Sequence, residues 1–491
     1  MTHEINDNYV NSVGRRFLEI CAEQPDFPAF IHERGTISYA QLANLCVSYG
    51  ARLAELGVKR GSIVALNTRD APNAVVVLLA LAFTGARLVT ANKVLASTKA
   101  VRPDFFLKTP EVQGSRQVVF QTIDASWQPT RLAPVSEIIA GLPRQDHATD
   151  PLIYLHTSGS TGTPKYFVLS DQMVLRRSLA MSREFERKQT RVAILQNAGS
   201  RPFYARAMAA LLNGCTIVDS TNTDFWYRAG VTLVTGALNQ IHGHIGDRIL
   251  SPRFANLEVS GTELRASQIA ELLKSFVQVE NAYGAGETSK SYGDIYALDE
   301  ALEIKCERGH CEGEIQVVDD ADQPVSAGTV GRVRVRNGFS IQSYLGNNAP
   351  DSSFRDGWFY SGDTAVWTKD DRLELLGRID NVINLAGIKV NALLVDMVIE
   401  SVDGISRAAT FKNPKPGAAD ELIAFIVLGP AVQKEYCIEQ ARHMCLQKLG
   451  AQATPANFWP VNTLPLTEKH EVDRPACAKL LLARAMELGA I

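Results

Sequence analysis

The sequence predicts an α/β fold with a large N-terminal domain and a small C-terminal domain. Short β-branched runs alternate with helical patterns over much of residues 1–285, which is typical of parallel sheets covered by helices. Within residues 313–376 polar and apolar residues alternate, which favours an antiparallel sheet with one face in solvent. After Gly377 helical and strand patterns resume, and this tail is long enough for a domain of its own.

Length and composition are those of an ordinary globular chain. It has 491 residues, of which 46% are hydrophobic and 21% charged, so a wholly disordered chain is excluded. The formal net charge is −3, from 50 basic and 53 acidic residues, and this balance does not favour nucleic-acid binding. The longest apolar run, residues 74–83, is too short to span a bilayer. From the polar N-terminus and eight scattered cysteines we expect no secretory signal and a reduced, cytoplasmic enzyme.

Local patterns predict the first elements as helix, strand and helix. Ser38 is a candidate N-cap for an amphipathic helix with apolar residues at helical spacing. Residues 62–67 (SIVALN) predict a buried strand, and the run at 74–83 predicts a helix that ends near Gly85. Residues 100–150 are interrupted repeatedly by proline and are predicted as short strands and loops.

The remaining elements are predicted from the same helical and strand patterns. The expected strands are residues 87–90, 192–195, 216–218, 232–234, 257–259, 277–279 and 422–428. The expected C-terminal helices are residues 392–402, 432–449 and 475–488.

Residues 152–165 (LIYLHTSGSTGTPK) are the most informative stretch. An apolar run leads into a loop dense in glycine, serine and threonine, and Lys165 closes it. Glycines let successive backbone N–H groups face one concavity, hydroxyls add donors and the lysine adds a charge, so the stretch predicts a phosphate-binding loop. The common nucleoside-triphosphatase spacing does not fit, because it requires glycine at Pro164 and serine or threonine at Tyr166. The alternative is a flexible, hydroxyl-rich surface loop.

This loop and four further segments resemble the motifs of the adenylate-forming superfamily, which comprises acyl- and aryl-CoA synthetases, adenylation domains of nonribosomal peptide synthetases, and luciferases. In the family's order and at its spacing, the segments are residues 157–165 (TSGSTGTPK), 281–287 (NAYGAGE), 358–363 (WFYSGD), 377–387 (GRIDNVINLAG) and 464–474 (LPLTEKHEVDR). The resemblance covers nearly the whole chain. It implies an AMP-binding, adenylation domain at residues 1–379, with two α/β layered subdomains and a distorted β subdomain. A small mobile α+β lid would follow at residues 380–491, with a hinge at Asp380.

The resemblance implies ATP-dependent activation of an aryl or acyl carboxylic acid. The carboxylate attacks the α-phosphate of ATP to give an acyl-adenylate and pyrophosphate, and a thiol then displaces AMP. The implied cofactors are ATP and Mg²⁺, and the implied acceptor is CoA or a phosphopantetheinylated carrier protein. Because no Asp-Ser carrier motif follows Arg474, we expect any carrier protein to be separate.

The resemblance also implies roles for individual residues. Glu287 and Thr157 would face Mg²⁺, Tyr283 would stack on adenine, and Asp363, helped by Arg378, would accept hydrogen bonds from the ribose. The implied nucleotide-binding residues are Thr157, Ser158, Gly159, Ser160, Thr161, Gly162, Thr163, Lys165, Gly261, Thr262, Asn281, Ala282, Tyr283, Gly284, Asp363 and Arg378, and the implied catalytic residues are Lys469, Glu287, Arg378 and Thr157. Taken alone, Asp363 reads equally well as a turn residue, Glu287 as a solvated glutamate and Tyr283 as a core residue.

The C-terminal motif departs from the family pattern. Its usual lysine bridges the substrate carboxylate and the α-phosphate, but here His470 stands at the motif's glycine position and Glu471 at its lysine position. Three interpretations follow: Lys469 takes over, adenylation is slow in an enzyme specialised for thiolation or the reverse reaction, or the protein is a catalytically impaired nucleotide-binding pseudoenzyme. We favour retained activity. Two smaller departures are Gly286 in place of a threonine and Tyr166 in place of a common glycine.

Residues 196–214 align with the segment in which amino-acid-activating members place an aspartate against the substrate ammonium. Arg201 falls at that position, which disfavours an α-amino acid and favours an anionic or hydroxylated substituent, with Arg206 as a second candidate. Gly284 and Ala285 would also face the substrate. The alternative is a surface arginine or an alignment slip. The stretch 306–311 (CERGHC) lacks a second ligand pair at zinc spacing, so no metal site is expected there.

Overall fold

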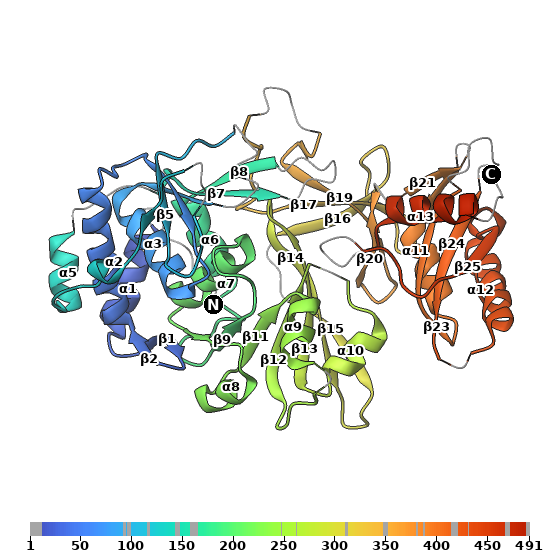
Figure 1. Cartoon of the computed structure of the whole chain (residues 1–491), viewed down its shortest axis with the longest axis horizontal. Coiled ribbons are helices and arrows are strands. Elements are labelled where there is room, and N and C mark those ends of the chain that lie inside the picture. Colours follow the sequence, from blue (N-terminus) through green and yellow to red (C-terminus); the bar gives the residue numbers. More distant parts are fainter. Residues whose placement is uncertain are drawn as a thin grey trace. The chain divides into compact units, whose positions relative to one another are not determined.

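The structure is a computed structural model that divides into two compact units (Figure 1). The first unit comprises Met1–Ile315 and Val335–Phe359, and the second comprises Gln316–Arg334 and Tyr360–Ile491. The domain boundary after residue 379 stays a prediction. The structure describes residues 12–91, 95, 100–114, 118–142, 148–157, 165–246, 248–261, 263–309, 313–346, 352–379, 382–385, 388–413, 421–430, 432–466 and 472–487.

A six-stranded sheet forms one layer of the first unit. Its order is β6-β5-β3-β4-β7-β8, and the neighbours are parallel except for the antiparallel pair β7 and β8. The strands are β3 (Ile63–Asn67), β4 (Arg87–Thr90), β5 (Phe105–Lys108), β6 (Gln121–Thr122), β7 (Pro151–Thr157) and β8 (Lys165–Ser170).

A nine-stranded sheet forms the second layer of this unit. Its order is β15-β14-β13-β12-β11-β9-β10-β1-β2, parallel from β1 to β13 and antiparallel at both edges. The strands are β1 (Pro28–His32), β2 (Gly35–Ser38), β9 (Arg191–Ile194), β10 (Thr216–Asp219), β11 (Leu233–Gly236), β12 (Phe254–Ser260), β13 (Phe276–Ala285), β14 (Ser289–Leu298) and β15 (Ile304–Arg308).

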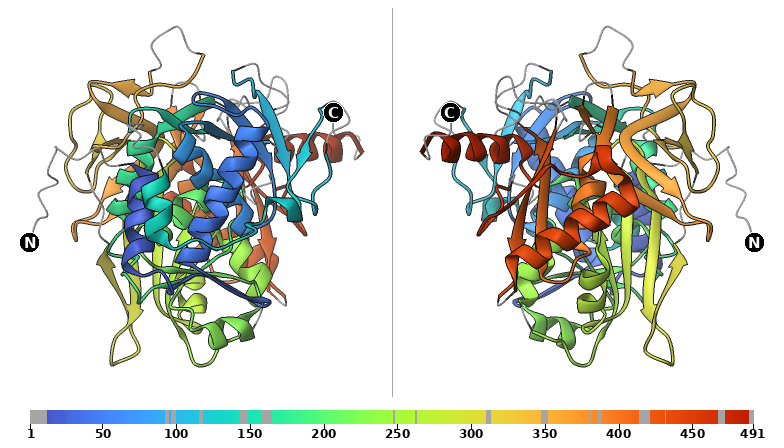
Figure 2. Two further views of the ribbon diagram at one scale, coloured as in Figure 1. Left: turned by 90° about the vertical axis from the view of Figure 1, so that its left-hand side faces the viewer. Right: turned by 90° about the vertical axis from the view of Figure 1, so that its right-hand side faces the viewer.

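Helices between the two sheets complete the core, because one buried cluster joins their apolar faces to residues of both sheets. They are drawn mostly in blue and green in Figures 1 and 2. The helices of the unit are α1 (Val13–Glu23), α2 (Tyr39–Glu55), α3 (Ala71–Thr84), α5 (Val135–Gly141), α6 (Asp171–Ala180), α7 (Arg201–Leu212), α8 (Thr223–Ala229), α9 (Leu238–Ile245) and α10 (Ala266–Leu272), with a 3₁₀ turn at Ala125–Trp127.

The helix caps show why these segments begin and end where they do. Ser38 and Gln41 form a reciprocal capping box at the start of α2, as the predicted N-cap requires. Asp70 accepts a hydrogen bond from the Asn73 N–H at the start of α3, and Gly85 ends that helix with φ of 67°. The prediction of only strands and loops in residues 100–150 is wrong at α5.

A five-stranded sheet contributes to both units, because the division runs through β16, β17 and β19. Its order is β16-β17-β19-β18, with β20 beside β19. The pairs β18–β19 and β19–β20 are antiparallel, as the alternating pattern predicts. The strands are β16 (Glu314–Val318), β17 (Val330–Arg336), β18 (Phe354–Arg355), β19 (Trp358–Trp367) and β20 (Leu373–Arg378).

The C-terminal part of the second unit is a three-stranded sheet, β23-β24-β25, with helices on both faces. Alternate residues of β24 enter different clusters: Leu422, Ala424 and Ile426 pack with α11 and α12, whereas Ile423 and Phe425 pack with α13. The elements are β21 (Val382–Leu385), β22 (Ile388–Asn391), α11 (Ala392–Glu400), β23 (Ile405–Lys412), β24 (Leu422–Leu428), α12 (Lys434–Leu449), a 3₁₀ turn at Ala451–Ala453, β25 (Asn457–Pro460) and α13 (Arg474–Glu487).

The predicted α/β class is confirmed, and the expected strands and C-terminal helices all correspond to elements of the structure. The sequence did not predict β21, β22, β23 or β25. No helix in the described part of the chain has both the length and the apolar character needed to cross a membrane. A cytoplasmic location stays a prediction.

Candidate functional site

Strands β7 and β8 hold the two ends of the predicted phosphate-binding loop. Thr157 is the last residue of β7 and Lys165 the first of β8, and the two are direct partners in the antiparallel register. Residues 158–164 between them, with the predicted Ser158, Gly159, Ser160, Thr161, Gly162 and Thr163, lie outside the described residues. The pairing of the strands therefore brings together the first and last residues of the segment.

Strand β13 carries the predicted residues 281–285 and bends where its sequence contains glycine. The register with β14 shifts between Tyr283 and Gly284. A side chain at Gly284 would overlap backbone atoms of Ser289 and Lys290, so only glycine allows this approach. Glu287 follows in the turn between β13 and β14, with 5% of its surface exposed.

The Glu287 carboxylate has one oxygen in a hydrogen bond and one without a protein partner. The buried Tyr344 hydroxyl donates to Oε1 at 2.5 Å. Among the residues that the structure describes, none donates to Oε2. The Lys165 ammonium lies 4.8 Å from the centroid of the Tyr344 ring, within cation–π range. Tyr344 thus contacts both Glu287 and the end of the predicted loop.

Arg201 lies in the same neighbourhood, at the start of α7 after the N-cap Ser200. A Cβ at Gly286 would lie 3.0 Å from Phe167 Cζ and 3.2 Å from Arg201 Cδ, so these two side chains leave little room for a threonine. Burial lowers the pKa of the Arg201 guanidinium, and the negative charge of Glu287 acts in the opposite direction. A guanidinium in this place can hold an anionic group beside Glu287.

Arg206, the second candidate for substrate recognition, is engaged in a buried ion pair. Its Nη2 and Nε atoms donate to Glu258 Oε1 at 2.5 and 2.9 Å. The ion pair neutralises Arg206, so it is a poor candidate for holding a substrate anion. Lys290 lies in a related buried group and contacts Glu280 at 2.5 Å and Glu184 at 2.6 Å.

Asp363 and Arg378 come together in the second unit as partners across β19 and β20. Arg378 Nη1 lies 3.5 Å from Asp363 Oδ1 and donates to the Ser361 carbonyl at 2.5 Å. Gly362 has φ of 76°, and a Cβ at this position would come within 2.7 Å of the Arg378 guanidinium. The glycine lets the guanidinium cover the backbone beside Asp363.

The strand-like residues around the C-terminal motif are described, but its central residues are not. Leu466 and Val472 form an isolated antiparallel bridge, and the Asp473 N–H donates to the Pro465 carbonyl at 3.0 Å. Outside the described residues lie Thr467, Lys469, His470 and Glu471, together with Thr262, His310, Cys311 and Asp380. Gly261, next to Thr262, is described and has φ of 88°.

Magnesium is the metal that the donor chemistry fits. The described residues contain no cluster of three or more histidine, cysteine or acidic side chains able to hold a metal ion. Mg²⁺ in nucleotide sites needs only one or two carboxylates, because phosphates and waters supply its other ligands. The Oε2 atom of Glu287 meets that requirement, and the Thr157 hydroxyl is a second oxygen donor predicted for the ion.

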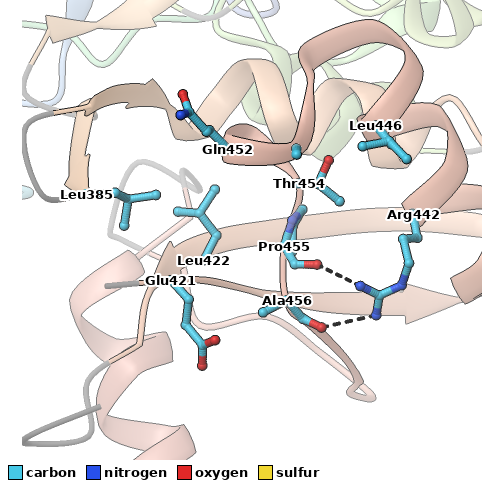
Figure 3. A pocket seen from close by; sticks show the side chains of 10 residues that line it. Leu385, Glu421, Leu422, Arg442, Leu446, Gln452, Thr454, Pro455 and Ala456 are labelled. Carbon is cyan, nitrogen blue, oxygen red and sulfur yellow. Dashed lines mark hydrogen bonds between the residues drawn. The ribbon is translucent and has the colours of Figure 1, made fainter. Parts of the chain in front are cut away.

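One pocket of the second unit is lined by none of the predicted site residues. Figure 3 shows that Leu385, Leu422 and Leu446 contribute apolar side chains to it, and its volume is about 440 Å³. Arg442 donates to the carbonyls of Pro455 and Ala456 at 3.2 and 3.1 Å. Because this guanidinium is engaged by the backbone, the pocket offers no evident anion site.

A family model described as AMP-binding enzyme matches residues 17–345, and the chain belongs to this family. Oxalate–CoA ligase of Arabidopsis thaliana is 24% identical over 502 residues, covering 91% of this chain and 94% of that protein. Probable CoA ligase CCL9 of Humulus lupulus is 24% identical over 68% of this chain and 67% of its own length. Surfactin synthase subunit 2 of Bacillus subtilis is 22% identical over 94% of this chain, which spans only 14% of that protein.

Solved structures share the fold. The amide bond synthetase McbA of Marinactinospora thermotolerans superposes with a TM-score of 0.77 at 19% identity, covering 95% of this chain and 99% of McbA. O-succinylbenzoate CoA synthetase of Bacillus subtilis, in complex with AMP, gives 0.75 at 19% identity over 94% and 97% of the two chains. The predicted membership of the adenylate-forming superfamily is confirmed, whereas the roles of single residues stay predictions.

Sequence reasoning missed Tyr344, Glu258 and Lys290. Tyr344 meets Glu287 across 57 positions of sequence, and Glu258 meets Arg206 across 52. No local spacing links such partners, so a single sequence carries no signal for these contacts.

Proposed function

We propose that this protein is an AMP-forming acid–thiol ligase that uses Mg²⁺ and ATP. The observation that carries the proposal is the Glu287 carboxylate, which is buried, fixed through Oε1 by Tyr344, and without a described partner at Oε2. The Lys165 ammonium lies over the same tyrosine ring. Membership of the AMP-binding family supports a nucleotide as the ligand of this group.

The proposed reaction has two steps. An oxygen of the substrate carboxylate attacks the α-phosphorus of ATP, and the bond to the bridging oxygen of pyrophosphate breaks. The sulfur of a thiol then attacks the acyl carbon, AMP leaves with the bonding electron pair, and the thiol proton passes to solvent.

The described residues have distinct proposed roles in the first step. Lys165 and Thr157 bind phosphate oxygens at the two ends of the loop, and Glu287 holds Mg²⁺, which neutralises phosphate charge when bound. Asp363, oriented beside Arg378, accepts hydrogen bonds from the ribose. Tyr283 stacks on adenine, and Arg201 faces the acid.

Coenzyme A is the acceptor we propose to test first. The relatives named as CoA ligases match at least two thirds of their own length, as oxalate–CoA ligase and CCL9 do. The peptide synthetase relatives match only a small part of theirs, so a carrier protein is the second choice.

A second candidate function is a nucleotide-binding protein without ligase activity. The specific observation in its favour is Glu471, a carboxylate at the family's lysine position, where it would repel phosphate. Lys469, two residues earlier, is the proposed replacement for that lysine.

Exchange of labelled pyrophosphate into ATP separates the two candidates. The enzyme is incubated with Mg²⁺, ATP and single acids from a panel of aryl, hydroxyaryl, dicarboxylic and medium-chain acyl compounds, with α-amino acids as a comparison set. The ligase proposal predicts acid-dependent exchange, followed by acyl-CoA formation when CoA is added. Nucleotide binding without exchange for any acid, and without acyl-CoA, supports the second candidate instead.

A further inference from the structure

The side chain of Arg177, on α6, ties together the two backbone segments that carry Glu287 and Tyr344. Its Nη1 donates to the Gly286 carbonyl at 2.8 Å, and its Nη2 donates to the Glu287 carbonyl at 2.7 Å. Its Nε and Nη2 also donate to the Phe339 carbonyl, at 3.1 and 2.8 Å. One guanidinium therefore contacts both residues of the Gly286–Glu287 pair and a residue five positions before Tyr344.

Direct bonds between the same two segments act in parallel. The Ile341 N–H donates to the Glu287 carbonyl at 2.9 Å, and the Asn337 side-chain amide donates to the Thr288 carbonyl at 2.9 Å. The Tyr344 hydroxyl then binds the Glu287 carboxylate itself. Arg177 and Ile341 fix the backbone of Glu287, whereas Tyr344 fixes its side chain.

The charge of Arg177 is costly where it lies. Burial, together with the charge of Arg201 and against the charge of Glu287, lowers the pKa of its guanidinium to about 9. Within the described residues Arg177 forms no ion pair, and its hydrogen-bond acceptors there are all backbone carbonyls. Burying a cation costs free energy, and the hydrogen bonds from Arg177 to the backbone carbonyls must compensate for this cost.

We propose that Arg177 is a positioning residue, which sets the backbone at Glu287 so that Oε2, which has no partner among the described residues, would be available to the Mg²⁺ of bound Mg²⁺·ATP. This inference rests on the proposed nucleotide site. A carboxylate binds a metal ion well only at a fixed geometry, so a displacement of Glu287 by about 1 Å would weaken its interaction with Mg²⁺. Apart from Glu287, none of the residues proposed to bind the nucleotide accepts a hydrogen bond from Arg177 in the described structure, so we expect its removal to weaken the magnesium-dependent part of binding selectively.

The test compares Arg177→Met with Arg176→Met. Both substitutions remove a guanidinium from the same helix, but Arg176 is exposed and its neighbour is not. Binding of a non-hydrolysable ATP analogue is measured by calorimetry with and without Mg²⁺, and pyrophosphate exchange is measured against Mg²⁺ concentration. Arg177→Lys, which keeps one donor group and the charge, is the conservative variant.

For Arg177→Met we expect an affinity for the analogue about tenfold weaker in the presence of Mg²⁺, because a loss of this size corresponds to about one charge-assisted hydrogen bond. Without Mg²⁺ we expect unchanged affinity. The Mg²⁺ concentration for half-maximal exchange rises by about the same factor. Arg177→Lys gives an intermediate shift, and Arg176→Met behaves as the wild type. If Arg177→Met does not fold, the same comparison is made with Arg177→Lys.

Two results overturn the inference: a folded Arg177 variant with wild-type magnesium dependence, or equal losses of affinity with and without Mg²⁺, which describe a general structural role. Failure of the ligase proposal would give a different set of results from failure of this inference. In that case the wild type catalyses no exchange with any acid, while the magnesium-dependent binding of the analogue still separates Arg177→Met from Arg176→Met.

Discussion

Two buried carboxylates, one in each unit, have opposite hydrogen-bond patterns. Asp396 in α11 is 2% exposed, and both of its oxygens have partners: Oδ1 accepts from the Thr410 N–H at 2.6 Å, and Oδ2 binds Arg474 at 2.5 Å. Glu287 is 5% exposed, and only Oε1 has a partner in the described structure. An arginine lies near each carboxylate, but Arg177 donates to the carbonyls of Gly286 and Glu287 and, among the described residues, forms no ion pair with the Glu287 carboxylate.

We interpret Asp396 as a structural carboxylate and propose that Glu287 is kept for a ligand. A buried charge without full partners costs free energy, so folding alone favours the arrangement of Asp396. Glu287 Oε2 has no partner among the described residues, and we propose that a bound cation fills this position. The predictions below test whether stability depends on Asp396 and chemistry on Glu287.

The largest expected effect is on stability. Asp396→Asn leaves Arg474 without its counter-ion and lowers the free energy of unfolding of the second unit by about 4 kcal/mol. Urea unfolding followed by circular dichroism measures the change. Asp403→Asn, at an exposed position near the same helix, is the control. Equal midpoints for both variants would show that the buried ion pair contributes nothing.

Glu287→Gln is expected to lower activity and to leave stability nearly unchanged, unlike Asp396→Asn. The amide oxygen still accepts from Tyr344, so stability changes little, but the negative charge offered to Mg²⁺ is lost. Pyrophosphate exchange falls by about 100-fold, or about 3 kcal/mol in the activation free energy. An exchange rate within a few-fold of the wild type would contradict the assignment of Glu287.

Tyr344→Phe tests the link between Glu287 and Lys165. The ring stays beside the lysine, while the hydroxyl that holds Oε1 is lost, at a cost of about 1.5 kcal/mol or about tenfold in exchange rate. Tyr292→Phe is the matched control, because its buried hydroxyl donates to the Asp294 carboxylate at 2.7 Å on β14. If both variants lose the same activity, the bond to Glu287 has no special role.

The smallest effect concerns a third buried carboxylate, Asp171. Its Oδ1 accepts from the Val13 N–H at 2.7 Å, whereas the buried Oδ2 lacks a partner in the described structure. Burial raises the pKa of Asp171 to about 7, and the charge of Asp150 adds to this. Between about pH 4 and 7 the folded state therefore binds more protons than the unfolded state, and the contribution of Asp171 to stability falls as pH rises.

Asp171→Asn keeps the acceptor for Val13 and removes the titration. At pH 7 we expect a change of no more than about 1 kcal/mol, together with a flatter dependence of stability on pH from 4 to 7. Urea midpoints at several pH values measure both quantities. A variant with the same slope as the wild type would show that Asp171 does not titrate in this range.

Local sequence patterns predicted much of the fold because caps and periodicity are local. The apolar run of α3, bounded by Asp70 and Gly85, needs no distant information. The loop that follows the apolar run at residues 152–156 was likewise predicted from contiguous residues, whereas the antiparallel pairing of β7 with β8 was not predicted. Strands β21, β22 and β25 have four residues each and were missed because short runs carry weak periodic signal. The eight-residue strand β23 was missed for a reason other than its length.

The contacts that define the site could not be predicted in this way. Arg177 reaches Glu287 across 110 positions of sequence, and its acceptors are carbonyls, which every residue possesses. Arg206 was considered for substrate binding until the structure showed its bond to Glu258. The tertiary fold decides which side chain neutralises or positions another. The type of a residue alone does not reveal its partner.

The most direct test of the role of Glu287 is calorimetric binding of a non-hydrolysable ATP analogue to the wild type and to Glu287→Gln, each with and without Mg²⁺. A carboxylate that holds Mg²⁺ predicts that the ion tightens binding to the wild type by about tenfold or more and leaves the variant nearly unchanged. Equal tightening in both proteins would contradict it.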